Sequence, residues 1–311
     1  MASQDRFHGL LIIDKPAGWT SHDVVGRLRR LLGQRSVGHA GTLDPAATGV
    51  LPIATGSALR ALEFLTDATK SYRAEITFGL STDALDIEGR VTSICPPPEL
   101  NQQQLRALLD TFLGQSEQVP PVFSAIKIDG TPLYERARRG EQFEPPTRSI
   151  VIERLDIVRW APPVLAVDID CSKGFYVRSF ARDLGLRGGS CAYLSDLIRT
   201  RVGDFDLCDA WRLDELAEAP FAEEWERIAI APDATALGLS TVILDTSRVI
   251  DWEHGKRWIV DGASSAGPVR VYDSTGVWLG IGELVAAEGG TILRPRKVIP
   301  TGAERLQEQD R

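Results

Sequence analysis

The sequence has 311 residues, of which 43% are hydrophobic and 25% are charged, values typical of a soluble globular protein long enough for two domains. Its net charge of −8 at pH 7 argues against an indiscriminate nucleic-acid binder, because such proteins are normally basic. No stretch approaches the roughly 18 apolar residues of a transmembrane helix, and the N-terminus lacks the apolar core of a signal peptide. We therefore expect a cytoplasmic protein with no membrane partner.

Hydrophobic periodicity predicts the elements of the first two thirds of the chain. Thr20 and Asp23 form a capping-box signature, apolar residues recur after them at helical spacing, and Gly33 follows as a helix stop. In chain order we expect a strand over 8–14, a helix between Thr20 and Gly33, a helix over 57–65, a strand over 72–78, a helix over 100–113, a strand over 120–130, a helix over 134–139, strands over 150–160 and 164–171, and a helix over 180–186.

The last third of the chain changes character. Two short acidic helices are expected over 213–219 and 221–230, and then short strands over 242–244, 269–272, 278–284 and 291–295. Helices mixed with strands, without regular strand–helix–strand alternation, favour an α+β fold around a central, largely antiparallel sheet flanked by helices. We expect a main domain over 1–237, a small β domain over 238–300 and a polar tail over 301–311.

Motifs for bound cofactors or metals are missing from the sequence. Neither Gly-x-Gly-x-x-Gly nor Gly-x4-Gly-Lys-[Ser/Thr] occurs. Cys95, Cys171, Cys191 and Cys208 show no Cys-x-x-Cys spacing, so we expect reduced, partly buried thiols and neither a zinc site nor a disulfide framework. We predict no cofactor and no metal.

Asp44 is the strongest candidate for a reactive group. It lies in the run Gly38–Leu51, where Pro45 fixes the chain after it and three glycines allow sharp bends. A single carboxylate held on such a turn can act as a nucleophile or a base. The alternative is an aspartate that only accepts hydrogen bonds within the turn.

The run Gly38–Leu51 resembles the catalytic loop of pseudouridine synthases of the bacterial TruB type, which isomerise uridine 55 in the T loop of tRNA. Four further segments resemble motifs of that family in the same order. They are Leu11–Ser21, Lys70–Arg73, Cys171–Ser179 and Tyr193–Arg201. The resemblance implies the pseudouridine synthase fold, a C-terminal domain of the PUA type, and a cofactor-free isomerase that flips its target base.

The resemblance also assigns roles to individual residues. Asp44, Tyr72 and Arg178 are the implied catalytic residues: Arg178 pairs with Asp44 and favours its ionised form, while Tyr72 stacks on the base and is a candidate proton acceptor at C5. Whether Asp44 attacks C1′, attacks C6 or abstracts a proton stays open. The implied substrate-binding residues are His39, which takes the place vacated by the flipped nucleotide, Leu197, which forms the wall opposite Tyr72, and Lys15 and Lys127, which are either structural or phosphate-facing.

The expected partner is tRNA, bound through its T arm by a monomer. Two other functions remain open: a relative that works under guide RNAs in a protein complex, and an RNA chaperone that folds the T arm with catalysis secondary. In the C-terminal strands, Arg294, Arg296 and Lys297 form a small basic cluster suited to phosphate contacts.

Overall fold

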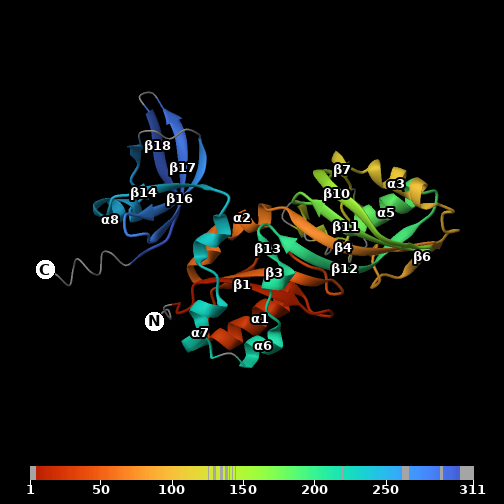
Figure 1. Ribbon diagram of the computed structural model, residues 1–311, viewed down its shortest axis with the longest axis horizontal. Helices are drawn as coiled ribbons and strands as arrows, with labels where there is room; N and C mark the ends of the chain where they lie inside the picture. The colour runs from red at the N-terminus through yellow and green to blue at the C-terminus, as the bar shows by residue number, and fades with distance from the viewer. Residues whose placement is uncertain are drawn as a thin grey trace.

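The computed structural model describes most of the chain, and the molecule is elongated (Figure 1). The described residues are 5–301, with gaps at 125, 129–130, 134–135, 137–138, 140, 142, 144, 219, 261–265 and 288–289. The expected polar tail, apart from its first residue, therefore lies outside the described residues, and so does most of the helix expected over 134–139.

A nine-stranded sheet forms the larger part of the molecule, with the strand order β1-β3-β12-β4-β11-β10-β7, β2 on β3 and β13 on β12. Every pair in it is antiparallel except β3 with β12. This confirms the α+β fold and its largely antiparallel sheet. The strands are β1 (Gly9–Lys15), β2 (Val37–His39), β3 (Thr48–Thr55), β4 (Lys70–Phe78), β7 (Gly114–Gln118), β10 (Arg148–Ala161), β11 (Val164–Cys171), β12 (Ala192–Val202) and β13 (Phe205–Asp206).

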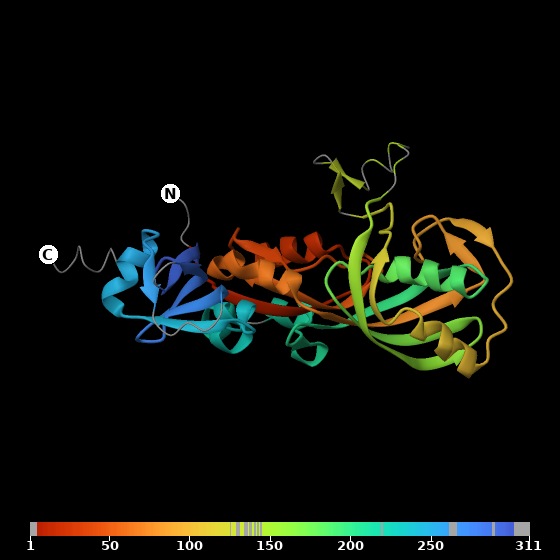
Figure 2. The ribbon, with the colours of Figure 1, turned by 90° about the horizontal axis from the view of Figure 1, so that it is seen from above.

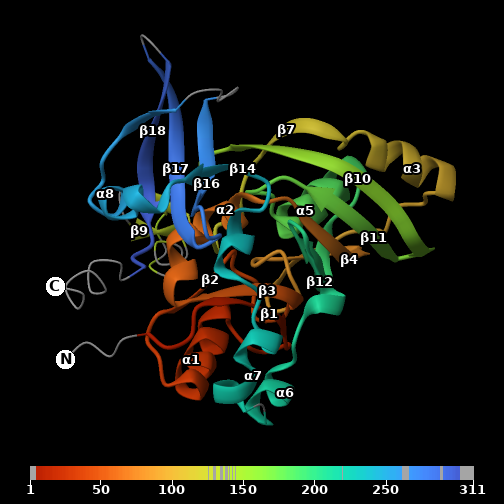
Figure 3. The ribbon, with the colours of Figure 1, turned by 60° about the vertical axis from the view of Figure 1, so that its left-hand side comes forward.

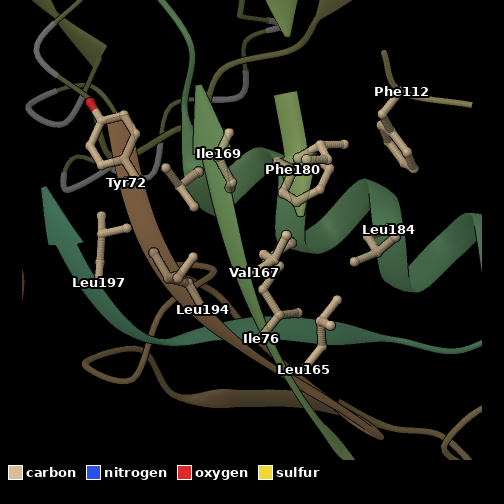
Figure 4. Close-up of a cluster of buried hydrophobic side chains, with 14 of the residues drawn as sticks. Tyr72, Ile76, Phe112, Leu165, Val167, Ile169, Phe180, Leu184, Leu194 and Leu197 are labelled. Atoms are coloured by element: carbon tan, nitrogen blue, oxygen red, sulfur yellow. The ribbon is translucent and has the colours of Figure 1, made fainter. Parts of the chain in front are cut away.

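Helices cover this sheet in two groups. The helices α1 (Ser21–Leu32), α6 (Leu213–Glu218) and α7 (Phe221–Ile228) share a buried cluster with β1 and β3 and gather on one face of these strands (Figure 3). The helices α3 (Gln102–Asp110) and α5 (Val177–Arg187) pack on the other half of the sheet, where Phe112, Phe180 and Leu184 meet the apolar faces of β4 and β11 (Figure 4).

The helix ends follow the sequence signals. The Thr20 side chain accepts a hydrogen bond from the Asp23 N–H, and the Asp23 side chain bonds back to the Thr20 N–H, so the capping box of α1 is complete. Gly33 ends α1 in the left-handed conformation, with φ of 62°, which glycine adopts without a steric cost. The helix expected over 57–65 is split into a 3-10 turn, η1 (Gly56–Ala61), and a short helix, α2 (Leu62–Asp67).

The segment 120–130 departs from expectation. Its described residues contain one two-residue strand, β8 (Lys127–Ile128), which pairs with β9 (Thr131–Pro132). These two strands project from the body of the molecule (Figure 2). The prediction of one strand that ends in a turn over this segment was therefore wrong for its described residues before Lys127. Pro120 and Pro121 lack the N–H that a sheet ladder needs.

Cys95 and Cys191 form a disulfide, so the prediction of reduced thiols was wrong for this pair. The bond joins the end of a short hairpin, made of β5 (Leu80–Thr82) and β6 (Val91–Ile94), to the residue before β12. The two cysteines are 96 residues apart in the sequence, and only the tertiary fold brings them together. Cys171 is buried and Cys208 exposed, both as free thiols.

The C-terminal strands form a separate five-stranded sheet with the order β14-β16-β17-β18-β15. It lies at one end of the molecule beside α2 (Figure 1), where Ile281 packs against Ala61 and Ala236. The elements are β14 (Ser240–Leu244), α8 (Val249–Glu253), β15 (Trp258–Val260), β16 (Gly267–Asp273), β17 (Trp278–Ala287) and β18 (Gly290–Val298). Within the described part of the chain, no helix has both the length and the apolar character needed to cross a membrane.

Candidate active site

Asp44 lies on the segment between β2 and β3, and this segment is fixed from two sides. The Gly18 N–H donates to the Pro45 carbonyl over 2.9 Å. The Leu43 N–H donates to Ser21 Oγ over 2.9 Å, and this hydroxyl donates back to the Leu43 carbonyl. The Asp44 side chain itself stays 37% exposed. A rigid backbone therefore presents one accessible carboxylate.

Arg178, in the first turn of α5, binds Asp44 through both carboxylate oxygens. Its Nε lies 2.9 Å from Oδ2 and its Nη2 lies 3.1 Å from Oδ1. The Arg178 side chain is 8% exposed and also donates to the carbonyls of Ala84 and Phe123. Paired bonds of this kind fix both the distance and the plane of a carboxylate. The predicted partners thus meet, although they are far apart in the sequence.

Asp86 is a second carboxylate beside Arg178, and the sequence reasoning missed it. Its Oδ2 lies 3.5 Å from Arg178 Nη1, at the turn of the β5–β6 hairpin. Burial raises the pKa of Asp86, while the neighbouring Arg178 acts in the opposite direction. In the sequence Asp86 looks like any polar residue of a turn, and no spacing links it to Asp44 or Arg178.

Tyr72 on β4 and Leu197 on β12 lie near Asp44, in one buried cluster that also holds Leu43 and Ala47. Figure 4 shows Tyr72 and Leu197 at the same end of the cluster, with the Tyr72 hydroxyl directed away from it. Burial raises the pKa of Tyr72 to about 12, so its hydroxyl is protonated at neutral pH. An aromatic ring and an aliphatic side chain thus lie beside the Asp44–Arg178 pair.

Arg199, also on β12, is a further residue that the sequence reasoning did not single out. Its side chain is buried and donates from Nε to the Val50 carbonyl over 2.7 Å and from Nη2 to the Gly41 carbonyl over 3.0 Å. Tyr72 lies directly opposite Arg199 in the pairing of β4 with β12, and the charge of Arg199 acts against the effect of burial on the Tyr72 pKa. A buried arginine on a strand could have been suspected only if β12 itself had been predicted.

His39 and Lys15 flank the same loop. Burial lowers the pKa of His39 to about 4, so its ring is neutral at pH 7. This ring meets His22 edge to face at 5.2 Å between centroids, and its buried Nδ1 has no hydrogen-bond partner among the described residues.

The Lys15 ammonium is fully buried and donates to the carbonyls of Pro16, Trp19 and Pro45. All three of its protons are used within the protein, which is the geometry of a structural lysine. Burial lowers its pKa to about 8. The Lys127 backbone belongs to β8, and its side chain lies outside what the structure describes. Over the described residues, no group of three or more His, Cys, Asp or Glu side chains could hold a metal ion.

The architecture is the pseudouridine synthase fold, which two solved structures share. One is "Structure of H/ACA RNP bound to a substrate RNA containing 2'-deoxyuridine", with a TM-score of 0.72 and 21% identity over 96% of this chain and 92% of that chain. The other is a Cbf5-Nop10-Gar1 complex, with a TM-score of 0.74 and 22% identity over 96% of this chain and 91% of that chain. At these identities the likeness concerns the fold alone.

Sequence relatives define the family. Residues 29–177 match the model of the N-terminal domain of TruB family pseudouridylate synthases, and residues 240–299 match that of the C-terminal region of TruB pseudouridine synthase II. The tRNA pseudouridine synthase B of Trichormus variabilis is 42% identical over 89% of this chain and 94% of that protein. The protein of the same name from Microcystis aeruginosa is 40% identical over 94% of this chain and 99% of that protein. The chain belongs to the TruB family of pseudouridine synthases.

Proposed function

We propose that the protein converts uridine 55 in the T loop of tRNA to pseudouridine, without a cofactor. The observation that carries this proposal is the two-point bond between Arg178 and the exposed carboxylate of Asp44, beside Tyr72 and Leu197. The relatives named tRNA pseudouridine synthase B support tRNA as the substrate. The choice of uridine 55 in the T loop is the more specific part of the proposal, and it rests on the five ordered motifs of the sequence.

The reaction is an isomerisation in which the bond from N1 of uracil to C1′ breaks, the base turns, and a bond from C5 to C1′ forms. Since the target atoms are buried in folded RNA, the nucleotide is flipped out before the chemistry. The flipped base lies between Tyr72 and Leu197, and the Asp44 carboxylate acts on the nucleotide in the orientation that Arg178 imposes. C5 loses a proton and N1 gains one, so no atom is lost overall.

His39 fills the space that the flipped nucleotide leaves in the RNA. Its ring is neutral at pH 7, so it contacts the RNA by stacking or hydrogen bonding and not as a cation. The protein binds the T arm as a cytoplasmic monomer. Residues 1–237 form the catalytic domain, and residues 238–300 form a PUA-like domain that contacts other parts of the tRNA.

The direct test incubates the purified protein with one unmodified tRNA transcript and maps pseudouridine along it. We expect modification at position 55 alone, no product when that uridine is replaced by cytidine, and no need for guide RNA or partner proteins. Asp44→Asn is expected to abolish product while tRNA binding and melting temperature stay near wild type. Asp168→Asn, a matched change at an aspartate that pairs with Arg73 on the surface, is expected to leave turnover within twofold of wild type.

Each alternative function predicts a different result. A guide-dependent relative would modify the transcript only after a guide RNA is added. If the protein were a folding chaperone, its Asp44→Asn variant would speed tRNA folding as well as the wild type does. The wild type would then form little or no pseudouridine. Turnover of Asp44→Asn within tenfold of wild type, about 1.4 kcal/mol in barrier, would contradict the role given to this carboxylate.

A further inference from the structure

Arg199 connects parts of the active site that come from different strands. It lies on β12 directly opposite Tyr72 of β4 in the strand pairing. Its two bonds to the carbonyls of Gly41 and Val50 hold both ends of the segment that carries Asp44. One side chain on a central strand therefore bonds the backbone of the catalytic loop and lies opposite Tyr72.

Arg199 and Tyr72 are directly paired residues of antiparallel strands, so their side chains project from the same face of the sheet and are neighbours. A guanidinium has only donors, so the phenolic oxygen is the acceptor in any hydrogen bond between the two side chains. Figure 4 shows the hydroxyl directed away from the apolar cluster. The Tyr72 hydroxyl thus lies at the edge of the cluster, on the strand position that Arg199 opposes.

The charge of Arg199 is unusual for a buried group. The residue is 1% exposed, and in the described part of the chain no carboxylate lies within ion-pairing distance of it. A buried cation without a counter-ion costs free energy of folding, and an apolar side chain of similar volume would avoid that cost. Stability alone therefore does not explain an arginine at this position.

We propose that Arg199 is a positioning residue, which holds the Tyr72 side chain and the Gly41–Val50 segment in one arrangement around the substrate. This inference rests on the proposed function, because the substrate is the flipped uridine. Arg199 does not touch the substrate, since its guanidinium is enclosed by protein. Its positive charge also opposes the effect of burial on the Tyr72 pKa.

The test is a double-mutant cycle on single-turnover rate with Arg199→Lys, Tyr72→Phe and the variant that carries both. Lysine keeps the charge but cannot reach two carbonyls and a hydroxyl in one plane. We expect Arg199→Lys to slow the wild type about tenfold, with the affinity for tRNA unchanged, and to slow Tyr72→Phe less than about twofold. Arg159→Lys, at an exposed ion pair with Glu75, is the matched control and should keep the wild-type rate.

The outcome that overturns the proposal is the same fold-loss from Arg199→Lys in both backgrounds, since a merely structural arginine would not act through Tyr72. A second measurement does not require the Arg199 variant to fold. In ¹⁵N-arginine-labelled protein, Tyr72→Phe should shift one exchange-protected guanidinium signal, and the absence of any shift would also overturn it. If the wild type makes no pseudouridine, the proposed function fails, whereas this NMR result still reports on the coupling between Arg199 and Tyr72.

Discussion

Arg178 lies between two carboxylates in different surroundings. The side chain of Asp44 is 37% exposed, while that of Asp86 is 11% exposed. The guanidinium also donates to the carbonyls of Ala84 and Phe123, so its donors are shared among four groups. Its position is fixed by the groups around it, and this is what lets it orient Asp44.

Arg178→Lys should therefore abolish most of the activity. An ammonium is a point donor and cannot bind both oxygens of Asp44 while serving the two carbonyls. We expect turnover to fall by about 10²-fold or more, near 2.7 kcal/mol in barrier, in a single-turnover assay. Arg182→Lys, on the same helix and bonded to the Val119 carbonyl, is the matched control. Near-normal turnover of Arg178→Lys would show that the planar two-point bond is unnecessary.

The lowered pKa of the buried Lys15 predicts that the stability of the protein depends on pH. Its pKa is about 8 in the folded protein and 10.5 in the unfolded chain, so between these values the unfolded chain binds more protons. The free energy of unfolding contributed by Lys15 therefore increases as the pH rises from 8 to 10.5. Lys70 shifts in the same direction, so the measurement is the difference between wild type and Lys15→Met in urea unfolding at several pH values. A difference that stays flat over this range would contradict the burial of a charged Lys15.

Several elements could be predicted from the sequence because their signals are local. The capping residues Thr20 and Asp23, the stop at Gly33 and the alternation of β11 each act within a few positions, and the structure confirms them. The motif residues Asp44 and Arg178 were predicted together, and the structure brings them into contact. These are the cases in which one stretch of chain carries its own signal.

The missed elements depend on distant partners. β12 pairs with β4 on one side and β3 on the other, and its polar positions Ser195, Arg199 and Arg201 hide the alternation of a strand. Arg199 is buried only because Tyr72, Gly41 and Val50 surround it, and Asp86 approaches Arg178 through a hairpin whose position its own sequence does not define. No window of neighbouring residues contains that information.

The disulfide connects two elements, the β5–β6 hairpin and β12, and its presence in solution can be tested. Two free thiols per denatured chain, Cys171 and Cys208, are expected in a thiol titration before reduction and four after it. Replacing Cys95 and Cys191 with alanine should lower the free energy of unfolding by about 2 to 4 kcal/mol, and Cys208→Ala serves as the control. Four thiols before reduction would mean that the bond does not form in solution.

In the whole molecule, the C-terminal sheet lies at the end remote from α5 (Figure 1). All three basic residues expected to bind phosphate pair with carboxylates of the protein: Arg294 with Glu283, and Arg296 and Lys297 with Glu63. Residue Glu63 belongs to α2, so two of these cations help to attach the sheet to the rest of the chain. The attachment is thus partly ionic as well as apolar.

Truncation after residue 237 should separate binding from chemistry. We expect it to weaken the binding of whole tRNA more than it slows the reaction on an isolated T-arm stem-loop, because Asp44, Tyr72 and Arg178 lie outside the deleted part. The logarithm of the binding constant falls linearly with the logarithm of the salt concentration. For each phosphate that loses its basic partner on the protein, this slope should become less steep by roughly 0.7 to 0.9. Equal impairment on both RNAs with a lower melting temperature would instead identify the sheet as a structural cap over Ala61 and Phe64.

The pairing of β3 with β12 has a consequence for synthesis of the chain. β3 pairs with β1 and, over Ile53–Thr55, with β2, both of which lie close to it in the sequence, but Thr48 and Gly49 pair with residues of β12, a strand that begins only at Ala192. At about 5 to 20 residues per second, translation takes roughly 7 to 30 s to pass from β3 to β12. Throughout this interval the part of the β3 edge that β2 does not cover can pair with other chains. A ribosome stalled in this interval would display the aspartate loop without Leu197 and Arg199, so the nascent enzyme stays inactive until its central strand emerges.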